Sequence, residues 1–151
     1  MWAWESSTGH NLVGMTYAGD LTPTEAWELL ERAPEAILVD VRTDAEWMFV
    51  GVPDLTGVGK KLVTVSWNRW PDGTLNPGFL EELSAAGVDG AGPVLFICRS
   101  GVRSRSAAVT ATRAGIAPSY NVSEGFEGEL DETGRRGRNG WRAAGLPWRQ
   151  S

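Results

Sequence analysis

The stretch PVLFICRSGVRSRS, residues 93–106, joins an apolar run to a polar loop and contains the only cysteine of the chain, Cys98. The run from Pro93 to Cys98 has the length and the β-branched and aromatic content of a buried strand. Glycine, serine and three arginines follow, and a helical pattern begins at about Val102. The stretch therefore predicts a strand, a tight loop and a helix, with the cysteine at the carboxyl end of the strand.

This position favours chemistry over simple packing. In open α/β sheets, ligands bind outside the carboxyl ends of the strands. Gly101 permits a curled loop whose backbone N–H groups face inward, and the following helix N-terminus adds partial positive charge. Together with nearby guanidinium groups, these features favour a negatively charged sulfur. A free cysteine is often a small buried apolar residue, but this combination favours a nucleophile or an anion-holding group.

The segments on either side predict alternating helices and strands. Thr22 and Glu25 have the spacing of a capping box, which starts a helix that ends at Pro34. Further helices are expected over 43–51 (one short turn), 78–87 and 102–115, and further strands over 36–41, 60–67 and 119–122. Strands that alternate with helices imply an α/β fold with a parallel sheet covered on both faces.

Composition limits the classes of function. The 151 residues, 42 % of them apolar, are enough for one domain with a real core. The apolar runs are too short to span a bilayer, and the first twelve residues lack a signal-peptide pattern, so we expect a cytoplasmic protein without membrane contact. One cysteine excludes an internal disulfide and a dithiol couple, and one histidine, His10, does not complete a Cys-rich zinc site. We expect His10 at the surface, and neither a metal nor another cofactor.

Charge is distributed unevenly along the chain. Residues 1–98 carry five basic and fourteen acidic residues, whereas residues 99–151 carry nine arginines and five acidic residues. The basic excess around the cysteine loop suits small anionic ligands. The overall net charge of −5 argues against a nucleic-acid partner.

A phosphatase is one reading of the cysteine loop. Its signature is a cysteine, five residues and then an arginine, but the sixth residue after Cys98 is Ser104. The tripeptide at Trp70–Asp72 matches the one that carries the general acid in tyrosine phosphatases, although Pro71-Asp72-Gly73 is also an ordinary turn sequence. The loop from Cys98 to Arg103 is one residue shorter than a phosphate cradle, which suits a single sulfur better.

Three segments carry a family resemblance: LVDVRTDAEWMFVGVPD at 38–54, FICRSGVRS at 96–104 and YNVSEGFEG at 120–128. In this order they resemble a single-domain rhodanese, a thiosulfate-type sulfurtransferase, over about residues 18–130. The resemblance implies a five-stranded parallel sheet flanked by helices. It also implies transfer of a sulfane sulfur from thiosulfate or a similar anionic donor to cyanide, a thiol or a protein acceptor. A non-catalytic module of the same fold, serving protein interaction or persulfide relay, is the alternative from another class.

The resemblance also implies roles for individual residues. Cys98 would carry the persulfide, Asp40 and Arg42 would brace its loop, Glu46 could pair with Arg42, and the pocket could be walled by Trp67 and Phe126. The anion-binding loop would consist of Arg99, Ser100, Gly101, Val102 and Arg103. Two positions depart from the family pattern: VGVPDL lacks a histidine, and Glu124 replaces a glycine.

The resemblance also divides the chain. Residues 1–17 would form an N-terminal extension and 18–130 the rhodanese-like domain. Residues 131–151 would form an irregular extension, rich in Gly, Arg and Trp, that packs on the domain through Trp141 and Trp148.

Overall fold

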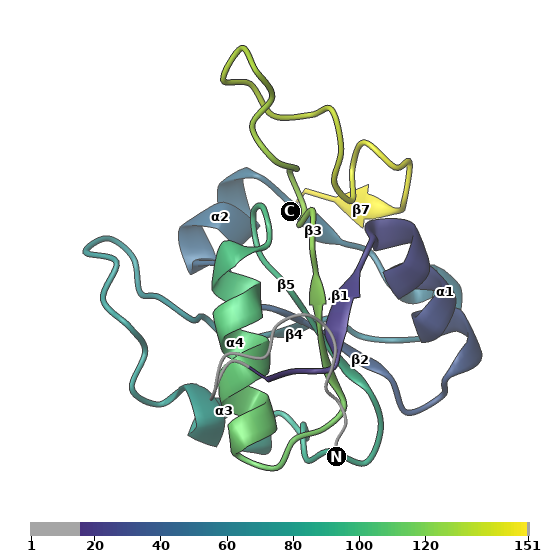
Figure 1. Cartoon of the computed structure of the whole chain (residues 1–151), viewed down its shortest axis with the longest axis vertical. Helices are drawn as coiled ribbons and strands as arrows, with labels where there is room; N and C mark the ends of the chain where they lie inside the picture. The colour runs from purple at the N-terminus through teal and green to yellow at the C-terminus, as the bar shows by residue number, and fades with distance from the viewer. Residues whose placement is uncertain (1–15, 151) are drawn as a thin grey trace.

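The computed structural model describes residues 16–150, so the expectation for His10 and most of the proposed N-terminal extension lie outside it. Its centre is a five-stranded sheet with the order β1-β6-β5-β2-β4, in which every pair is parallel (Figure 1). The strands are β1 (Gly19–Leu21), β2 (Ile37–Asp40), β4 (Val63–Thr64), β5 (Val94–Ile97) and β6 (Ser119–Val122). The expected α/β fold with a five-stranded parallel sheet is confirmed.

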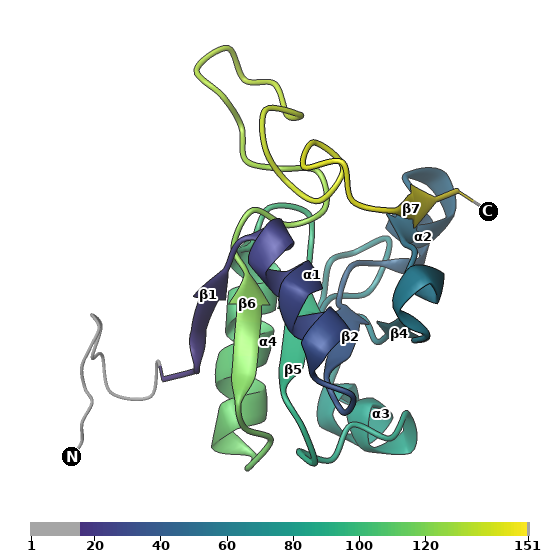
Figure 2. The same ribbon diagram turned by 90° about the vertical axis from the view of Figure 1, so that its right-hand side faces the viewer.

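Helices cover both faces of this sheet. Helix α1 (Pro23–Arg32) lies on one face, and helices α3 (Phe79–Ala85) and α4 (Val102–Arg113) lie on the other (Figure 2). Helix α2 (Asp44–Phe49) and a 3₁₀ turn, η1 (Thr56–Val58), follow β2. No helix within the described residues is long and apolar enough to cross a membrane.

Local sequence explains where the first two helices begin. Thr22 accepts a hydrogen bond from the Glu25 N–H, and the Glu25 carboxylate accepts one from the Thr22 N–H, which forms the predicted capping box of α1. Thr43 and Glu46 form a second capping box at the start of α2. Reciprocal caps of this kind satisfy backbone donors that a helix start leaves unpaired.

Two cores result from the alternation of side chains along the strands. On the α3 and α4 face, Phe96 and Cys98 belong to one apolar cluster. On the α1 face, Leu95 and Ile97 belong to the other. All four residues of β5 are buried, as the continuous apolar run predicted. The strand therefore delivers Cys98 to the sheet edge on the side that α4 covers.

The predicted strand over 60–67 is shorter in the structure. Only Val63–Thr64 pair as β4, and Lys60 instead extends its ammonium to the carbonyl oxygens of Ala33, Pro34 and Ala36 at 2.9–3.1 Å. This contact fixes the chain after α1 and removes Lys60 from the alternating pattern.

The tail consists mostly of turns and loops, as expected, but it includes one short strand within 131–150. Strand β7 (Trp148–Arg149) pairs antiparallel with β3 (Val52–Pro53). Trp141 is fully buried in the α1-side core, 5.9 Å from the ring of Trp27, and its indole N–H donates to the Pro147 carbonyl. Trp148 stays 41 % exposed and contacts Phe126 edge-on. Backbone pairing with β3 and one buried indole therefore anchor this segment, most of which loops out beyond the carboxyl ends of the central strands (Figure 2).

Candidate active site

Cys98 lies directly after β5, and its sulfur is enclosed by the start of α4. The residue is 1 % exposed, and its Sγ accepts hydrogen bonds from the backbone N–H groups of Gly101 and Ser104 at 3.2 and 3.3 Å. The Ser104 hydroxyl oxygen lies 3.1 Å from the same sulfur. Two inward N–H donors at a helix start form an anion-binding arrangement around this sulfur.

Gly101 makes the curl possible. Its φ is +105°, a conformation that side chains other than glycine rarely adopt. An added Cβ would also collide with the Ser123 carbonyl oxygen. Gly101 is the N-cap of α4 without a side-chain cap, so the first N–H groups of this helix remain directed at Cys98.

The segment after β6 supports the loop from behind. The Phe126 N–H donates to the Cys98 carbonyl at 2.8 Å, and the Glu127 N–H donates to the Arg99 carbonyl at 3.0 Å. Gly125 lets the two backbones approach, because a Cβ there would lie 2.5 Å from the Arg99 carbonyl group.

The tail continues this support. The Trp141 N–H donates to the Gly125 carbonyl at 2.8 Å. Glu124, a departure from the family pattern, accepts a hydrogen bond from the Gly140 N–H at 3.0 Å. The tail therefore contacts the segment that holds the cysteine loop.

Asp40 and Arg42 form a fully buried ion pair with an N···O distance of 2.7 Å. Arg42 also donates to the Gly51 carbonyl at 2.7 Å, and its guanidinium stacks over the ring of Phe126 at 4.4 Å. Through Phe126, whose N–H donates to the Cys98 carbonyl, the pair is in contact with the segment that binds the loop. Glu46 does not pair with Arg42, contrary to the sequence expectation: Arg42 binds Asp40 and the Gly51 carbonyl, and Glu46 binds another arginine.

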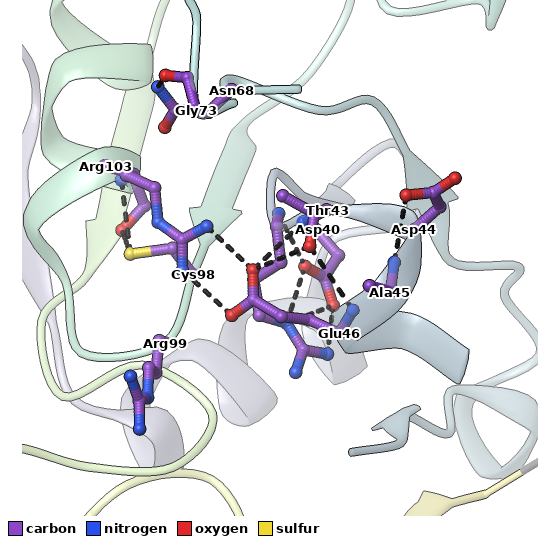
Figure 3. Close-up of polar contacts among 12 residues, drawn as sticks. Asp40, Thr43, Asp44, Ala45, Glu46, Asn68, Gly73, Cys98, Arg99 and Arg103 are labelled. Atoms are coloured by element: carbon purple, nitrogen blue, oxygen red, sulfur yellow. Dashed lines mark hydrogen bonds and ion pairs between the residues drawn. The ribbon is translucent and has the colours of Figure 1, made fainter. Parts of the chain in front are cut away.

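Glu46 instead forms a two-point ion pair with Arg103, at 2.8 and 3.0 Å (Figure 3). Burial alone would raise the pKa of Glu46, but the hydrogen bonds from Arg103 and Thr43 and the charge of Arg103 lower it to about 2. Burial likewise opposes the charge of Arg103, yet Glu46 raises the pKa of this guanidinium overall. Both groups therefore stay ionised near neutral pH and join α2 to the cysteine loop.

A cavity of about 440 Å³ opens beside the loop. Its lining consists of Thr43, Ala45, Glu46, Val50, Trp70, Arg99, Arg103 and Glu127. Trp67 and Phe126, expected as walls, are not among these residues: Trp67 packs in the α3 and α4 core, 5.1 Å from the Phe79 ring, and Phe126 packs in the α1-side core. Trp70, which is 65 % exposed, contributes the indole at this cavity instead.

Arg99 is the more accessible of the two cavity arginines. Its side chain is 49 % exposed, its contact with Glu127 is 3.5 Å long, and in Figure 3 its guanidinium points away from the sulfur. Ser100 and Val102 complete the loop, and Val102 is 70 % exposed as the first residue of α4. In residues 16–150, no cluster of His, Cys, Asp and Glu has the arrangement of a metal site.

The Trp70-Pro71-Asp72 tripeptide forms a turn. The Asp72 carboxylate accepts hydrogen bonds from the Thr74 N–H and hydroxyl at 3.2 and 3.0 Å, and Gly73 has a φ of +74°. These local bonds lower the pKa of Asp72, so this exposed carboxyl is ionised near neutral pH rather than held as an acid. This geometry supports the turn interpretation over the phosphatase one.

Sequence reasoning missed three contributors to the site. Ser104 contacts the sulfur, Asn121 binds Ser104, and Trp70 lines the cavity. The sequence did point to Ser104, because it is the sixth residue after Cys98, the position at which a phosphatase has its arginine. Asn121 gave no local signal, since it meets the loop only through the pairing of β5 with β6.

Comparisons with known proteins agree with this architecture. The family model for the STR4 middle domain matches residues 19–151. The crystal structure of Rv0390 from M. tuberculosis superposes with a TM-score of 0.83 at 57 % identity, over 90 % of this chain and 100 % of that one.

Curated sequences give the same placement. An uncharacterized protein of Rickettsia conorii is 35 % identical over 130 residues, which are 85 % of this chain and 95 % of that protein. Thiosulfate sulfurtransferase GlpE of Actinobacillus pleuropneumoniae is 30 % identical over 128 residues, 85 % of this chain and 90 % of that protein. With this fold, this cysteine loop and these relatives, the chain belongs to the STR4 middle-domain family of rhodanese-like proteins.

Proposed function

We propose that this protein is a sulfurtransferase that moves a sulfane sulfur from thiosulfate, or a similar anionic donor, to a thiophilic acceptor through a persulfide on Cys98. The observation that carries the proposal is the pair of backbone N–H groups, from Gly101 and Ser104, that donate to the Cys98 sulfur. The similarity to a thiosulfate sulfurtransferase supports the same reaction class.

The reaction has two transfer steps. The Cys98 thiolate attacks the outer sulfur of thiosulfate, a Cys98 S–S bond forms, and the donor's S–S bond breaks. Sulfite leaves with the electron pair of the broken bond, and the negative charge on the cysteine moves to the outer persulfide sulfur. A cyanide ion or an acceptor thiolate then attacks this outer sulfur, which yields thiocyanate or an acceptor persulfide and regenerates the Cys98 thiolate.

The charge of the intermediate fits the loop. Inward N–H groups at the helix start stabilise an anion at this place, first on the cysteine and then on the outer sulfur. No cofactor or metal enters either step.

Arg99 is the group we assign to capture the donor's sulfonate. Arg103 is engaged by both oxygens of Glu46, whereas Arg99 is half exposed, lines the cavity and makes one long contact with Glu127. A charged guanidinium with free donors suits a sulfonate. The cavity of about 440 Å³ has room for a small acceptor thiol, and the proposal includes a protein thiol as acceptor. A reducing compartment such as the cytoplasm suits a reaction that depends on a free thiol.

The loop geometry disfavours phosphate-ester hydrolysis. Ser104, at the register of the phosphatase arginine, is fully buried against the sulfur. Asp72, the one candidate acid from the tripeptide, is bonded within its own turn.

The test compares wild type with Cys98→Ser in a thiosulfate:cyanide assay and with aryl phosphates. We expect wild type to form thiocyanate and to leave aryl phosphates intact. Cys98→Ser should stay folded but lose sulfur transfer, because a serine hydroxyl does not ionise near neutral pH. Retained transfer in Cys98→Ser would exclude Cys98 as the sulfur carrier. Aryl phosphate turnover that depends on Cys98 and Asp72 would favour a phosphatase. Inactivity in both assays would favour a non-catalytic module of the same fold.

A further inference from the structure

A chain of side-chain hydrogen bonds connects the Cys98 sulfur to the surface of β1. The Ser104 hydroxyl lies 3.1 Å from the sulfur and donates to Asn121 Oδ1 at 2.6 Å. Asn121 Nδ2 donates to Asp20 Oδ1 at 3.0 Å, and the Tyr17 hydroxyl donates to the same oxygen at 2.8 Å. Cys98, Ser104 and Asn121 are buried, whereas Asp20 is exposed.

The sheet register creates this chain. Asp20 and Asn121 are direct partners in the pairing of β1 with β6, and Asn121 is also the partner of Phe96 in β5, two residues before Cys98. The polar side chains therefore line one face of the sheet beside the start of α4.

Counting protons fixes the direction of each bond. Asp20 Oδ1 accepts from both Tyr17 and Asn121, so Asn121 turns its NH₂ group toward Asp20 and its oxygen toward Ser104. A hydroxyl has one proton, and the short bond to Asn121 uses it. What Ser104 presents to the sulfur is then a lone pair, which accepts a hydrogen bond from a thiol but repels a thiolate.

Tyr17 reinforces the first link. Its burial, followed by its hydrogen bond to Asp20 and the charge of Asp20, raises the pKa of Tyr17 to about 12. The phenol therefore keeps its proton across the working pH range and donates to Asp20, which remains an acceptor.

We propose that Asn121, oriented by Asp20, is a positioning residue that directs the Ser104 hydroxyl proton away from Cys98. Ser104 then gives the Cys98 thiolate no hydrogen bond, and among the described residues only the two backbone N–H groups donate to it. For Ser104 to donate to the thiolate as well, its hydroxyl would have to leave Asn121, whose oxygen would then be buried without a partner. A persulfide incurs no such cost, because its charge lies on the outer sulfur. The arrangement therefore withholds from the thiolate a hydrogen bond that the persulfide does not need. The inference rests on the proposed function only in treating Cys98 as the reacting group.

The experiment below uses variants of Asn121, Ser104 and Asp20. Only the Asp20 variants change a charge, and the other charged groups around Cys98 stay as they are. Arg103 contributes a positive charge at the sulfur and is paired with Glu46, and Asp40 faces Arg103 from the end of β2. Arg99 points away and contacts Glu127, while Arg105 interacts with Tyr17. Differences between the other variants therefore report the hydroxyl orientation.

The experiment measures the pH midpoint of thiolate formation from ultraviolet absorbance, with Cys98→Ser as the blank, since the chain has no other cysteine. Asn121→Leu removes the acceptor at similar volume and frees Ser104 to donate to the thiolate. We expect its midpoint to fall by about one to two pH units, the value of one hydrogen bond to a charged group. In a Ser104→Ala background, the same Asn121→Leu change should produce no fall.

Asp20→Ala tests the same link from the exposed end, where no buried side chain is removed, and should also lower the midpoint. Asp20→Asn keeps an acceptor oxygen and should lower it less, which separates orientation from the charge of Asp20. An unchanged midpoint in Asn121→Leu and Asp20→Ala would overturn the proposal, and so would an equal fall with and without Ser104. No sulfur donor is used, so the result is independent of whether the protein transfers sulfur.

Discussion

Replacing Glu46 with glutamine tests how the two-point ion pair holds α4 to α2. The glutamine side chain keeps an oxygen for the capping box with Thr43 but removes the charge that binds Arg103. The matched control is Glu25→Gln, because Glu25 has the same place in the capping box of α1, and no salt bridge in the described part of the chain joins it to a cation.

The magnitude follows from the geometry and exposure of the pair. Two bonds of 2.8 and 3.0 Å join side chains that are 25 % and 21 % exposed. Hydrogen bonds to charged groups contribute about 1.5–3 kcal/mol and exposed ion pairs about 0–1 kcal/mol. For a mostly buried pair we expect Glu46→Gln to lower the free energy of unfolding by about 1–2 kcal/mol more than Glu25→Gln does.

The effect should depend on pH with a definite sign. The pKa of Glu46 falls from 4.5 to about 2 on folding, so its contribution is complete above pH 4.5 and is lost as the pH falls toward 2. Urea unfolding of the three proteins at about pH 7 and about pH 3.5 measures this dependence. Equal stabilities of the two variants at neutral pH, or a difference that does not shrink in acid, would refute the reasoning.

Three further predictions concern the loop and the tail. Arg99→Ala should reduce thiosulfate:cyanide efficiency by roughly ten- to a hundredfold and the use of an uncharged donor by less, and equal losses would count against sulfonate binding. Gly101→Ala should abolish transfer because its Cβ meets the Ser123 carbonyl, whereas Gly137→Ala, with a similar φ of +112° and no atom within 4 Å, should not. Trp141→Ala should lower the free energy of unfolding by about 3–5 kcal/mol in urea titrations. Trp148→Ala, at the surface, should cost much less, and similar costs would argue against a core role for Trp141.

Local sequence signals were sufficient to predict the individual strands and helices and the conformation of the cysteine loop. The apolar run of β5, the capping residues of α1 and Gly101 each specify their own conformation, so strand, helix and loop followed from neighbouring residues. The conformations of strand, helix and loop depend on contacts within a few residues along the chain. The number of strands in the sheet came from the family resemblance.

Features that depend on distant pairing were not predictable in the same way. From the sequence, Glu46 could form an ion pair with Arg42 or with Arg103. In the structure Arg42 pairs with the buried Asp40, and Glu46 pairs with Arg103. Asn121 reaches Ser104 only through strand register. The tail looked irregular because its buried indole, Trp141, lies in a stretch rich in Gly and Arg without an alternating or helical pattern, and β7 forms only against β3.

Mass spectrometry of the intact protein after thiosulfate treatment tests the central claim most directly. The account predicts a gain of the mass of one sulfur atom, located on Cys98 by peptide mapping, removed by cyanide and absent from Cys98→Ser. An unmodified Cys98 in the folded protein at saturating thiosulfate would contradict it.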